Sequence, residues 1–244
     1  MRVKGIRENI EHSETKTFFE KRAAKYSEEN PYQTTMLQDN NPELVIERNK
    51  REVEVLKPKL HLNKGSKVLD LACGVGRWAD AICEDISEYC GIDFSQNLIQ
   101  IAKKRNLKSN FYFYEGDLTD LEAALRERKD TKYNTVLIAG VLVYMNDDDL
   151  LDVISQAERR CDEKAVICIR EPIGIDERLT LKDFFSEELK ENYSAIYRTR
   201  AELMKYFQTA LIERGFQVVD EGFLFENNLN NRKETSQYYF IFER

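Results

Sequence analysis

The sequence has little that could bind a metal ion. Its 244 residues include two histidines, His12 and His61, and five cysteines, none of which forms a Cys-x-x-Cys pair. Zinc sites are built mostly from thiolates and imidazoles at short, regular spacings, so we expect no metal site. The number of cysteines is odd, and Cys90 and Cys168 lie in apolar segments. This is typical of buried thiols in a reducing compartment, and we expect all five to be of this kind.

Long apolar segments are also missing. No run of 18 or more apolar residues occurs, so we expect no membrane span, and the polar residues 1–16 lack the apolar centre of a signal peptide. The net charge is −7, from 37 basic and 44 acidic residues. This charge disfavours a nucleic-acid partner, because phosphate binding needs a basic surface. We expect a cytoplasmic protein, monomeric or homodimeric, that binds neither membranes nor nucleic acids.

From residue 66 onward, short β-rich segments alternate with segments of helix length. Strands are expected at 67–72, 88–93, 110–117, 134–140 and 165–172, and helices at 77–85, 96–106, 121–129 and 147–160. Such alternation is typical of a doubly wound, mostly parallel sheet. The nearly continuous apolar runs of the last two strands suit strands that are covered on both faces.

The two ends of the chain depart from this alternation. Residues 1–65 are expected to be helical and polar and to form an N-terminal cap on the main domain, 66–244. Residues 173–198, after Pro172, are too many for an ordinary connection and predict an inserted lid or substrate segment. A helix and two strands then complete the chain. With no helix between them, these strands are expected to pair as an antiparallel hairpin.

The loop between the first expected strand and helix carries glycines in the stretch VLDLACGVGRWA, residues 68–79. Gly74 and Gly76 let the backbone turn tightly and approach a ligand. Taken alone, G-x-G-x-x-A also matches the dinucleotide fingerprint of a dehydrogenase. Asp70, at the end of the strand, would repel a pyrophosphate and attract a cofactor that carries an ammonium and a sulfonium. It therefore favours S-adenosylmethionine over NAD, although the residue could instead only cap the next helix.

Two more acids follow the next two strands. Asp93 ends the second strand, and its two oxygens can accept both ribose hydroxyls of an adenosine. Asp117 follows the third strand and can accept from an adenine amino group, with Leu118 against the ring. A single acid at a strand end is usually a helix cap. Three acids after three successive strands, all at the carboxyl edge of the sheet, predict a ligand site.

Together these residues resemble the core of the class I S-adenosylmethionine-dependent methyltransferases, over residues 66–172. The match is an acidic strand end followed by a glycine-rich loop, although Ala72 stands where many members have glycine. The resemblance implies an α/β fold with a seven-stranded, doubly wound sheet that has one antiparallel strand. It also implies S-adenosylmethionine as cofactor. The cofactor-binding residues it implies are Asp70, Ala72, Cys73, Gly74, Gly76, Asp93, Phe94, Asp117, Leu118 and Ala139.

The acceptor is less well defined by the sequence. Nucleobase amino methyltransferases of this family usually carry an Asn/Asp-Pro-Pro-aromatic run after the fourth strand. Residues 139–142 read AGVL, so the resemblance is to the small-molecule branch. Residues 18–26 resemble the helical lid of that branch, with plain helix packing as the alternative. Tyr144 and Glu171 are the candidates for a catalytic base, and Tyr144 could equally be an ordinary core or surface tyrosine.

Arginines and tyrosines are mixed in the segment after the fifth strand. Such a mixture can bind a carboxylate or phosphate together with an apolar body, and a solvated helix surface is the alternative. The candidate acceptor-binding residues are Tyr26, Arg170, Arg178, Tyr193, Tyr197, Arg198 and Arg200. We expect methylation of a small polar metabolite, such as an anionic sugar or phosphorylated precursor, with oxygen favoured over nitrogen. The alternatives are an NAD-dependent oxidoreductase and a non-catalytic S-adenosylmethionine-binding regulatory protein.

Overall fold

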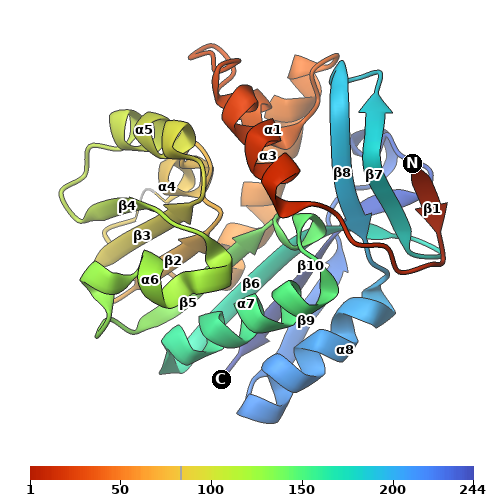
Figure 1. Ribbon diagram of the computed structural model, residues 1–244. Coiled ribbons are helices and arrows are strands. Elements are labelled where there is room, and N and C mark those ends of the chain that lie inside the picture. The colour runs from red at the N-terminus through yellow and green to blue at the C-terminus, as the bar shows by residue number, and fades with distance from the viewer. Residues whose placement is uncertain (83) are drawn as a thin grey trace.

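A seven-stranded sheet forms the centre of the computed structural model, which describes residues 1–82 and 84–244 (Figure 1). Its strand order is β4-β3-β2-β5-β6-β10-β9. The strands are β2 (Lys67–Leu71), β3 (Glu88–Asp93), β4 (Phe111–Glu115), β5 (Tyr133–Ala139), β6 (Cys161–Gly174), β9 (Gln217–Phe223) and β10 (Thr235–Glu243). The pairings from β4 to β6 are parallel, whereas β10 runs antiparallel to both β6 and β9. This is the predicted doubly wound fold with its one reversed strand.

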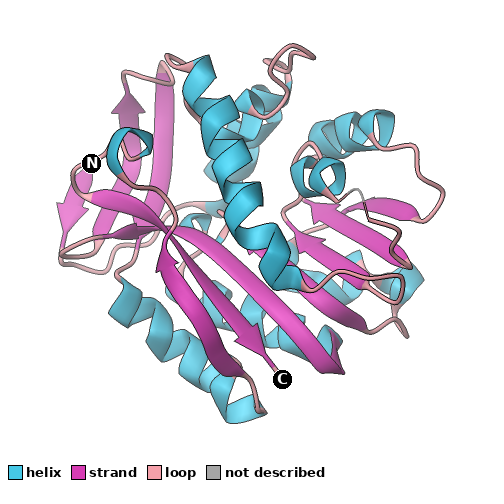
Figure 2. Cartoon of the chain, turned by 180° about the vertical axis from the view of Figure 1, so that it is seen from behind, coloured by secondary structure: helices cyan, strands magenta, loops and turns pink. Residues whose placement is uncertain are grey.

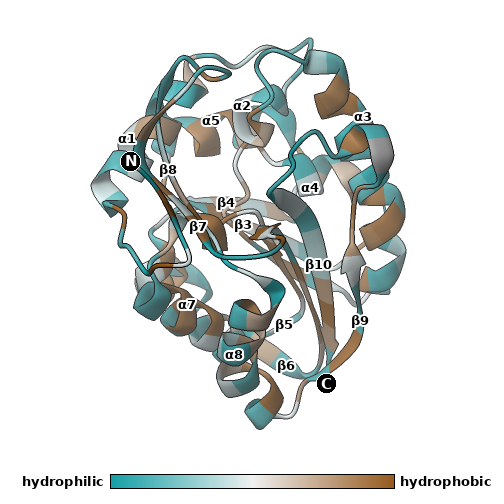
Figure 3. Ribbon diagram, turned by 90° about the vertical axis from the view of Figure 1, so that its right-hand side faces the viewer, coloured by the Kyte–Doolittle hydropathy of each residue, from teal (hydrophilic) through white to brown (hydrophobic). Residues whose placement is uncertain are grey.

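Helices cover both faces of this sheet. On one face, α6 (Leu121–Ala124), α7 (Asp147–Arg160) and α8 (Arg200–Ala210) pack on strand residues such as Leu69 and Ile92. On the other face, α3 (Pro42–Leu56), α4 (Arg77–Ala81) and α5 (Gln96–Arg105) pack on the alternate residues, such as Val68 and Tyr89. Figure 2 shows the α3 face from behind. Because both faces are covered, successive residues at the centres of β5 and β6 are apolar. Figure 3 shows hydrophobic strands between helices with hydrophilic outer sides.

Two predicted helices are shorter than the sequence pattern suggests. The helix expected at 77–85 ends at Ala81, because Ile82 adopts an extended backbone and is fully buried. The helix expected at 121–129 ends at Ala124 and is followed by a 3-10 turn, Arg126–Arg128. Helix α8 begins as expected: the Thr199 hydroxyl accepts from the Glu202 backbone N–H, and the Glu202 carboxylate accepts from the Thr199 N–H.

The first residues and the inserted segment form a second, three-stranded sheet. Strand β1 (Arg2–Lys4) pairs with β7 (Leu179–Ser186), which pairs with β8 (Glu191–Tyr197). The expectation that residues 1–65 are helical is therefore wrong at the N-terminus, where residues 2–4 complete the edge of this sheet. Helices α1 (His12–Ala23) and α2 (Gln33–Met36) follow. Figure 1 shows β7 and β8 standing beside α1 above the main sheet.

The described cysteines Cys73, Cys90, Cys161 and Cys168 are buried and free, and Cys83 lies outside the described residues. No helix in the described part of the chain is long and apolar enough to cross a membrane. Among residues 1–82 and 84–244, no group of three or more histidine, cysteine, aspartate or glutamate side chains is arranged to hold a metal ion.

Candidate active site

A cavity of about 860 Å³ lies between the carboxyl ends of the parallel strands and the small sheet. One part of its lining comes from the loop after β2 and from Asp93 and Asp117. Another part comes from three tyrosines, Tyr144, Tyr193 and Tyr197. Residues predicted to bind a cofactor and residues predicted to bind an acceptor therefore share one continuous space.

The glycine loop has the tight backbone that its sequence predicts. Gly74 and Gly76 have φ angles of +54° and +81°, in the left-handed region that favours glycine. A Cβ atom at Gly74 would lie 2.9 Å from Cγ2 of Thr35, which belongs to α2 of the cap. Ala72 also has a positive φ, +60°, which explains physically why glycine is the common residue there in the family.

Asp93 connects the second strand to this loop. Its Oδ2 accepts from the Gly74 N–H at 2.9 Å, and its Oδ1 accepts from the Ser95 N–H at 2.9 Å. Each oxygen keeps a further lone pair, so ribose hydroxyls can still donate to the carboxylate. Burial raises the pKa of Asp93 to about 6.

Asp70 lies deeper, at the end of β2, with 2% of its surface exposed. It accepts a hydrogen bond from the Tyr89 hydroxyl, and burial raises its pKa to about 7. Within residues 1–82 and 84–244 no cation is bonded to it, and a buried carboxylate of this kind suits a ligand that brings positive charge. The side chain lines the cavity, as the electrostatic argument from the sequence requires.

Asp117 is bonded to the cap. His12 Nε2 of α1 lies 2.8 Å from Asp117 Oδ2, and Thr119 donates to Oδ1 through both its backbone N–H and its hydroxyl. The hydrogen bond from His12 holds the pKa of Asp117 well below its usual value, and the same bond raises the pKa of His12. The His12 ring also faces Phe94, with ring centroids 5.8 Å apart. This link between the cap and the predicted adenine side has no signal in the sequence, because His12 is a lone histidine 105 residues from Asp117.

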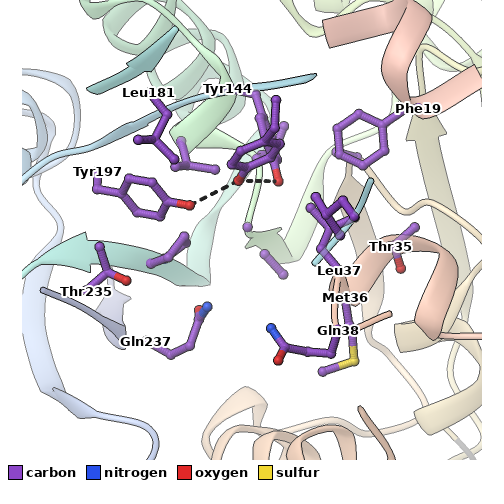
Figure 4. A pocket seen from close by; sticks show the side chains of 18 of the residues that line it. Phe19, Thr35, Met36, Leu37, Gln38, Tyr144, Leu181, Tyr197, Thr235 and Gln237 are labelled. Atoms are coloured by element: carbon purple, nitrogen blue, oxygen red, sulfur yellow. Dashed lines mark hydrogen bonds between the residues drawn. The ribbon is translucent and has the colours of Figure 1, made fainter. Parts of the chain in front are cut away.

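The three tyrosines form a hydrogen-bonded chain in the cavity (Figure 4). The Tyr144 and Tyr193 hydroxyls are 3.3 Å apart, and those of Tyr193 and Tyr197 are 3.1 Å apart. Burial raises the pKa of each of them, so they are protonated hydrogen-bonding groups at neutral pH rather than bases. Phe19 of α1 meets Tyr144 edge to face. Tyr26, the other predicted acceptor tyrosine, does not line the cavity and accepts a hydrogen bond from Arg105.

Glu171, the other candidate base, is not in the cavity. Its Oε1 accepts from the backbone N–H groups of Gly140, Val141 and Leu142 at 2.8–3.0 Å, and its Oε2 accepts from Val143. The carboxylate therefore holds the loop after β5, and burial raises its pKa. The structure therefore gives Glu171 a structural role and does not support the prediction that it is a base.

Three of the four predicted acceptor arginines point elsewhere. Arg178 and Arg198 both bind Asp147, at 2.9 and 2.7 Å, and Arg198 also donates to two backbone carbonyls. Arg200 pairs with Glu221 on the surface. None of these three lines the cavity. They stabilise the junction between the small sheet, α7 and α8, so the structure does not support an anion clamp made from them.

Comparison with known proteins agrees with this geometry. Residues 68–164 match the family model of a methyltransferase domain. The chain therefore contains a methyltransferase domain over these residues. The predicted cofactor, S-adenosylmethionine, is confirmed.

Curated methyltransferases share only a segment of the chain. The demethylmenaquinone methyltransferase of Staphylococcus carnosus (strain TM300) is 33% identical over 66 residues, which cover 25% of this chain and 27% of that protein. The 23S rRNA (uracil(1939)-C(5))-methyltransferase RlmD of Aliivibrio fischeri (strain MJ11) is 32% identical over 93 residues, which cover 37% and 21%. The chain thus spans about a quarter of the length of the curated relatives it matches.

Solved structures share the fold over nearly the whole chain. Phosphoethanolamine N-methyltransferase 1 of Haemonchus contortus has a TM-score of 0.72 at 15% identity, covering 95% of this chain and 48% of that one. The N-methyltransferase NodS of Bradyrhizobium japonicum has a TM-score of 0.60 at 16% identity, covering 94% and 97%. Both were solved with S-adenosylhomocysteine.

On the side of the cavity formed by α3 and β6, the lining contains the predicted Arg170 and two arginines that the sequence analysis missed, Arg48 and Arg77. Glu52 of α3 is buried between Arg77, at 2.6 Å, and Arg170, at 3.1 Å. Burial raises the pKa of Glu52, but Arg170 and Arg77 together hold it below its usual value. Arg48, one turn before Glu52, also lines the cavity. Its spacing of four residues from Glu52, on the helix face that also carries buried Val45, was a readable signal.

Proposed function

We propose that this protein transfers a methyl group from S-adenosylmethionine to a small polar acceptor that carries an anionic group. The observation that carries the proposal is the single cavity, which joins Asp70, Gly74 and Asp93 to the three tyrosines. Methyl transfer needs the nucleophile and the methyl carbon held in line, with water excluded. A continuous space between a cofactor part and an acceptor part allows this alignment.

The cofactor residues carry distinct tasks in this proposal. The bound S-adenosylmethionine supplies an already activated methyl group. Asp93 holds the ribose hydroxyls, and Asp117 with Leu118 holds the adenine. Asp70 offers negative charge near the glycine loop, and Ala139 offers its backbone carbonyl to the methionine end. All of these residues belong to the main sheet and its loops. Asp117 is also hydrogen-bonded to His12 of the cap.

The choice of acceptor atom follows from the groups in the cavity. Tyr144 keeps its proton, because burial raises its pKa, and Glu171 is bonded to four backbone N–H groups outside the cavity. A carboxylate oxygen or an unprotonated amine needs no base, whereas an ordinary hydroxyl does. We therefore favour a carboxylate oxygen as the atom that accepts the methyl group, and an amine nitrogen as the alternative.

In this proposal, the cap and the hairpin of β7 and β8 in the inserted segment cover the acceptor part of the cavity. Phe18 and Phe19 of α1 pack with Leu189 of the hairpin and with Val75 and Leu98 of the main domain. This apolar cluster joins residues 1–65 and 173–198 across the cavity. A small acceptor enclosed in this way is consistent with a sugar or phosphorylated precursor, and the Haemonchus neighbour, of which this chain covers 48%, was solved with phosphoethanolamine.

The test has two stages. Calorimetry should first show binding of S-adenosylhomocysteine and no binding of NAD. Turnover is then measured with methyl-labelled S-adenosylmethionine and a panel of small carboxylates, amines and phosphorylated compounds. A labelled product that loses its methyl group in mild alkali identifies a methyl ester of a carboxylate. A label that survives alkali indicates an N-methyl amine or an O-methyl ether, which mass spectrometry of the product distinguishes. Binding of cofactor without turnover on any acceptor would favour the non-catalytic alternative, and NAD binding without a response to S-adenosylhomocysteine would overturn the proposal.

A further inference from the structure

Arg48 is a buried cation without a bonded anion. It is 7% exposed and lines the cavity. Its guanidinium donates to the Leu229 carbonyl at 2.6–2.8 Å and to Asn231 Oδ1 at 2.8 Å, and it lies over the ring of Phe225. Across residues 1–82 and 84–244, no carboxylate forms an ion pair with it. Burial and the neighbouring charge of Arg232 lower its pKa to about 10. Buried charges in proteins are normally paired, so a missing anion is the simplest explanation.

Arg170 of β6 lies on the face of the sheet that α3 covers, and it also lines the cavity. Its Nε is 3.1 Å from Glu52, at ion-pair distance but without hydrogen-bond geometry. Its Nη1 donates to Gln237 Oε1 at 3.2 Å. Glu52 is shared with Arg77, so one carboxylate is shared by two guanidinium groups. This side of the cavity thus carries excess positive charge.

Two glutamine amides face this charge from opposite sides. Gln237 Oε1 accepts from Arg170, and Gln38 Oε1 accepts from Asn231 at 2.9 Å. In each amide the oxygen is used, and neither Nε2 makes a hydrogen bond within the described part of the chain. Figure 4 shows Gln38 and Gln237 reaching into the cavity toward each other. Both therefore offer N–H donors to a ligand in the space between them.

Except for Arg170, this group lies away from the cofactor part of the site. The Arg170 guanidinium borders Gly140, next to Ala139 at the predicted methionine end. The strand order places β10 three strands from β2, which is about 14 Å at the usual strand spacing. Asp93 and Asp117 follow β3 and β4, on the far side of β2. A cofactor held by those acids and by the glycine loop reaches toward β5. The free donors on α3 and β10 lie beyond it, where the acceptor must enter.

We propose that the guanidinium groups of Arg48 and Arg170 bind a phosphate or carboxylate group of the acceptor other than the group that is methylated, with the two glutamine amides completing the site. This inference rests on the proposed function and adds the chemistry by which the acceptor is recognised. Arginine presents paired N–H donors that match both anions. The tyrosine hydroxyls on the opposite wall then face the uncharged part of the acceptor.

The experiment measures anion binding to protein already saturated with S-adenosylhomocysteine. That ligand occupies the place of the cofactor carboxylate, so a further anion must bind elsewhere. Inorganic phosphate and acetate are titrated separately at constant ionic strength, and binding is followed by NMR chemical shifts and by the melting temperature. The variants are Arg48→Met, which keeps the apolar stem, and Gln237→Leu, which removes the amide at nearly constant volume. Arg200→Gln is the matched control, because Arg200 is ion-paired outside the cavity.

We expect phosphate or acetate to bind the saturated parent and to bind Arg48→Met about tenfold or more weakly, the usual effect of losing a charge-assisted hydrogen bond. Gln237→Leu should be weakened less, and Arg200→Gln should match the parent. Stronger binding of phosphate than of acetate would identify a phosphorylated acceptor, and the reverse a carboxylate. If Arg48→Met does not fold, Gln237→Leu alone decides.

Two results would overturn this inference. Anion binding that disappears when S-adenosylhomocysteine is present would assign the arginines to the cofactor carboxylate. Equal anion binding by the parent and both cavity variants, or none by the saturated parent, would show that the arginines are structural. Failure of the proposed function is separate, because it appears as absent S-adenosylhomocysteine binding in the same samples before any anion is added.

Discussion

His12 of the cap helix is hydrogen-bonded to Asp117, the acid that follows β4, at 2.8 Å. One side chain of the cap thus binds a residue that we assign to the adenine side of the cofactor site. Docking of α1 and binding of cofactor therefore share a carboxylate, and protonation of His12 should influence both.

The first prediction is a pH-dependent stability from this pair. The pKa of His12 is raised above its ordinary 6.5, so its contribution is fully present below pH 6.5 and is lost as the pH rises through the raised value. The pKa of Asp117 is depressed below 3.8, so its contribution holds above that value and is lost only in stronger acid. Both groups are about 40% exposed, which limits the effect to a few tenths of a kcal/mol up to about 1 kcal/mol.

The measurement is the melting temperature of the parent and of His12→Gln between pH 5 and pH 9. The parent should be more stable than the variant at pH 5.5 and should lose this advantage by pH 9. His61→Gln is the control, since His61 is an exposed histidine outside the cavity. A constant difference between parent and His12→Gln across the range would contradict the ion pair.

Cofactor affinity should depend on the ionisation of Asp70. Its pKa is raised to about 7 by burial, and a cationic cofactor favours the charged form. The affinity for S-adenosylmethionine should therefore rise with pH up to about 7, by at most about tenfold per pH unit for one proton, and then level off. Asp70→Asn should bind more weakly at pH 8 and lose this dependence.

The same variant tests the cost of burying the charge. Above the ordinary pKa of 3.8, the folded protein holds a carboxylate whose ionisation is disfavoured by burial, so Asp70 lowers the stability of the cofactor-free protein at high pH. Asp70→Asn should then raise the melting temperature at pH 8 and not at pH 4. Affinity that is independent of pH in the parent would show that Asp70 does not face the positive charge of the cofactor.

Some features of the fold and the site are readable from the sequence because they depend on neighbouring residues. The strand–helix alternation follows from local apolar patterns, and the acids Asp70, Asp93 and Asp117 each follow such a strand. Parallel strands end at one edge of a sheet, so these acids had to converge. The tyrosines Tyr193 and Tyr197 share a strand face at a spacing of four residues, which brings both into the cavity.

Other features depend on partners that are distant in the sequence. Asp147 pairs with Arg178 and Arg198, which lie 31 and 51 residues away, and no local pattern distinguishes an arginine that is paired from one that is free. The pairing of β1 with β7 joins residues about 180 positions apart. The anion-clamp hypothesis was wrong for Arg178 and Arg198. The sequence shows that they are arginines, but it does not show that both are paired with Asp147 in the fold.

Asp93 provides the most direct test of cofactor placement. Asp93→Ala should weaken S-adenosylhomocysteine binding by about 2–4 kcal/mol, because it leaves ribose hydroxyls and the Gly74 N–H without a partner. The fold should survive, since the residue ends a strand at the sheet edge. Calorimetry and circular dichroism measure the two effects, with the exposed Asp85→Ala as control. Unchanged affinity in Asp93→Ala would show that the ribose lies elsewhere.

Arg198 and Arg200 lie two residues apart, and their alanine variants form a matched pair. We expect Arg198→Ala to lower the free energy of unfolding strongly and Arg200→Ala to change it little. Arg198 is 1% exposed, binds Asp147 and donates to the carbonyls of Leu142 and Met145. Arg198→Ala leaves the two buried carbonyls without this donor and leaves Asp147 with Arg178 alone, which should lower the free energy of unfolding by about 2–4 kcal/mol. Arg200→Ala removes only an exposed ion pair and should change it by less than about 1 kcal/mol. Urea unfolding measures both, and cofactor affinity at low temperature checks that the remaining folded protein is intact. If Arg198→Ala is as stable as Arg200→Ala and instead raises the KM for an acceptor, the arginine reaches the cavity and the structural assignment is wrong.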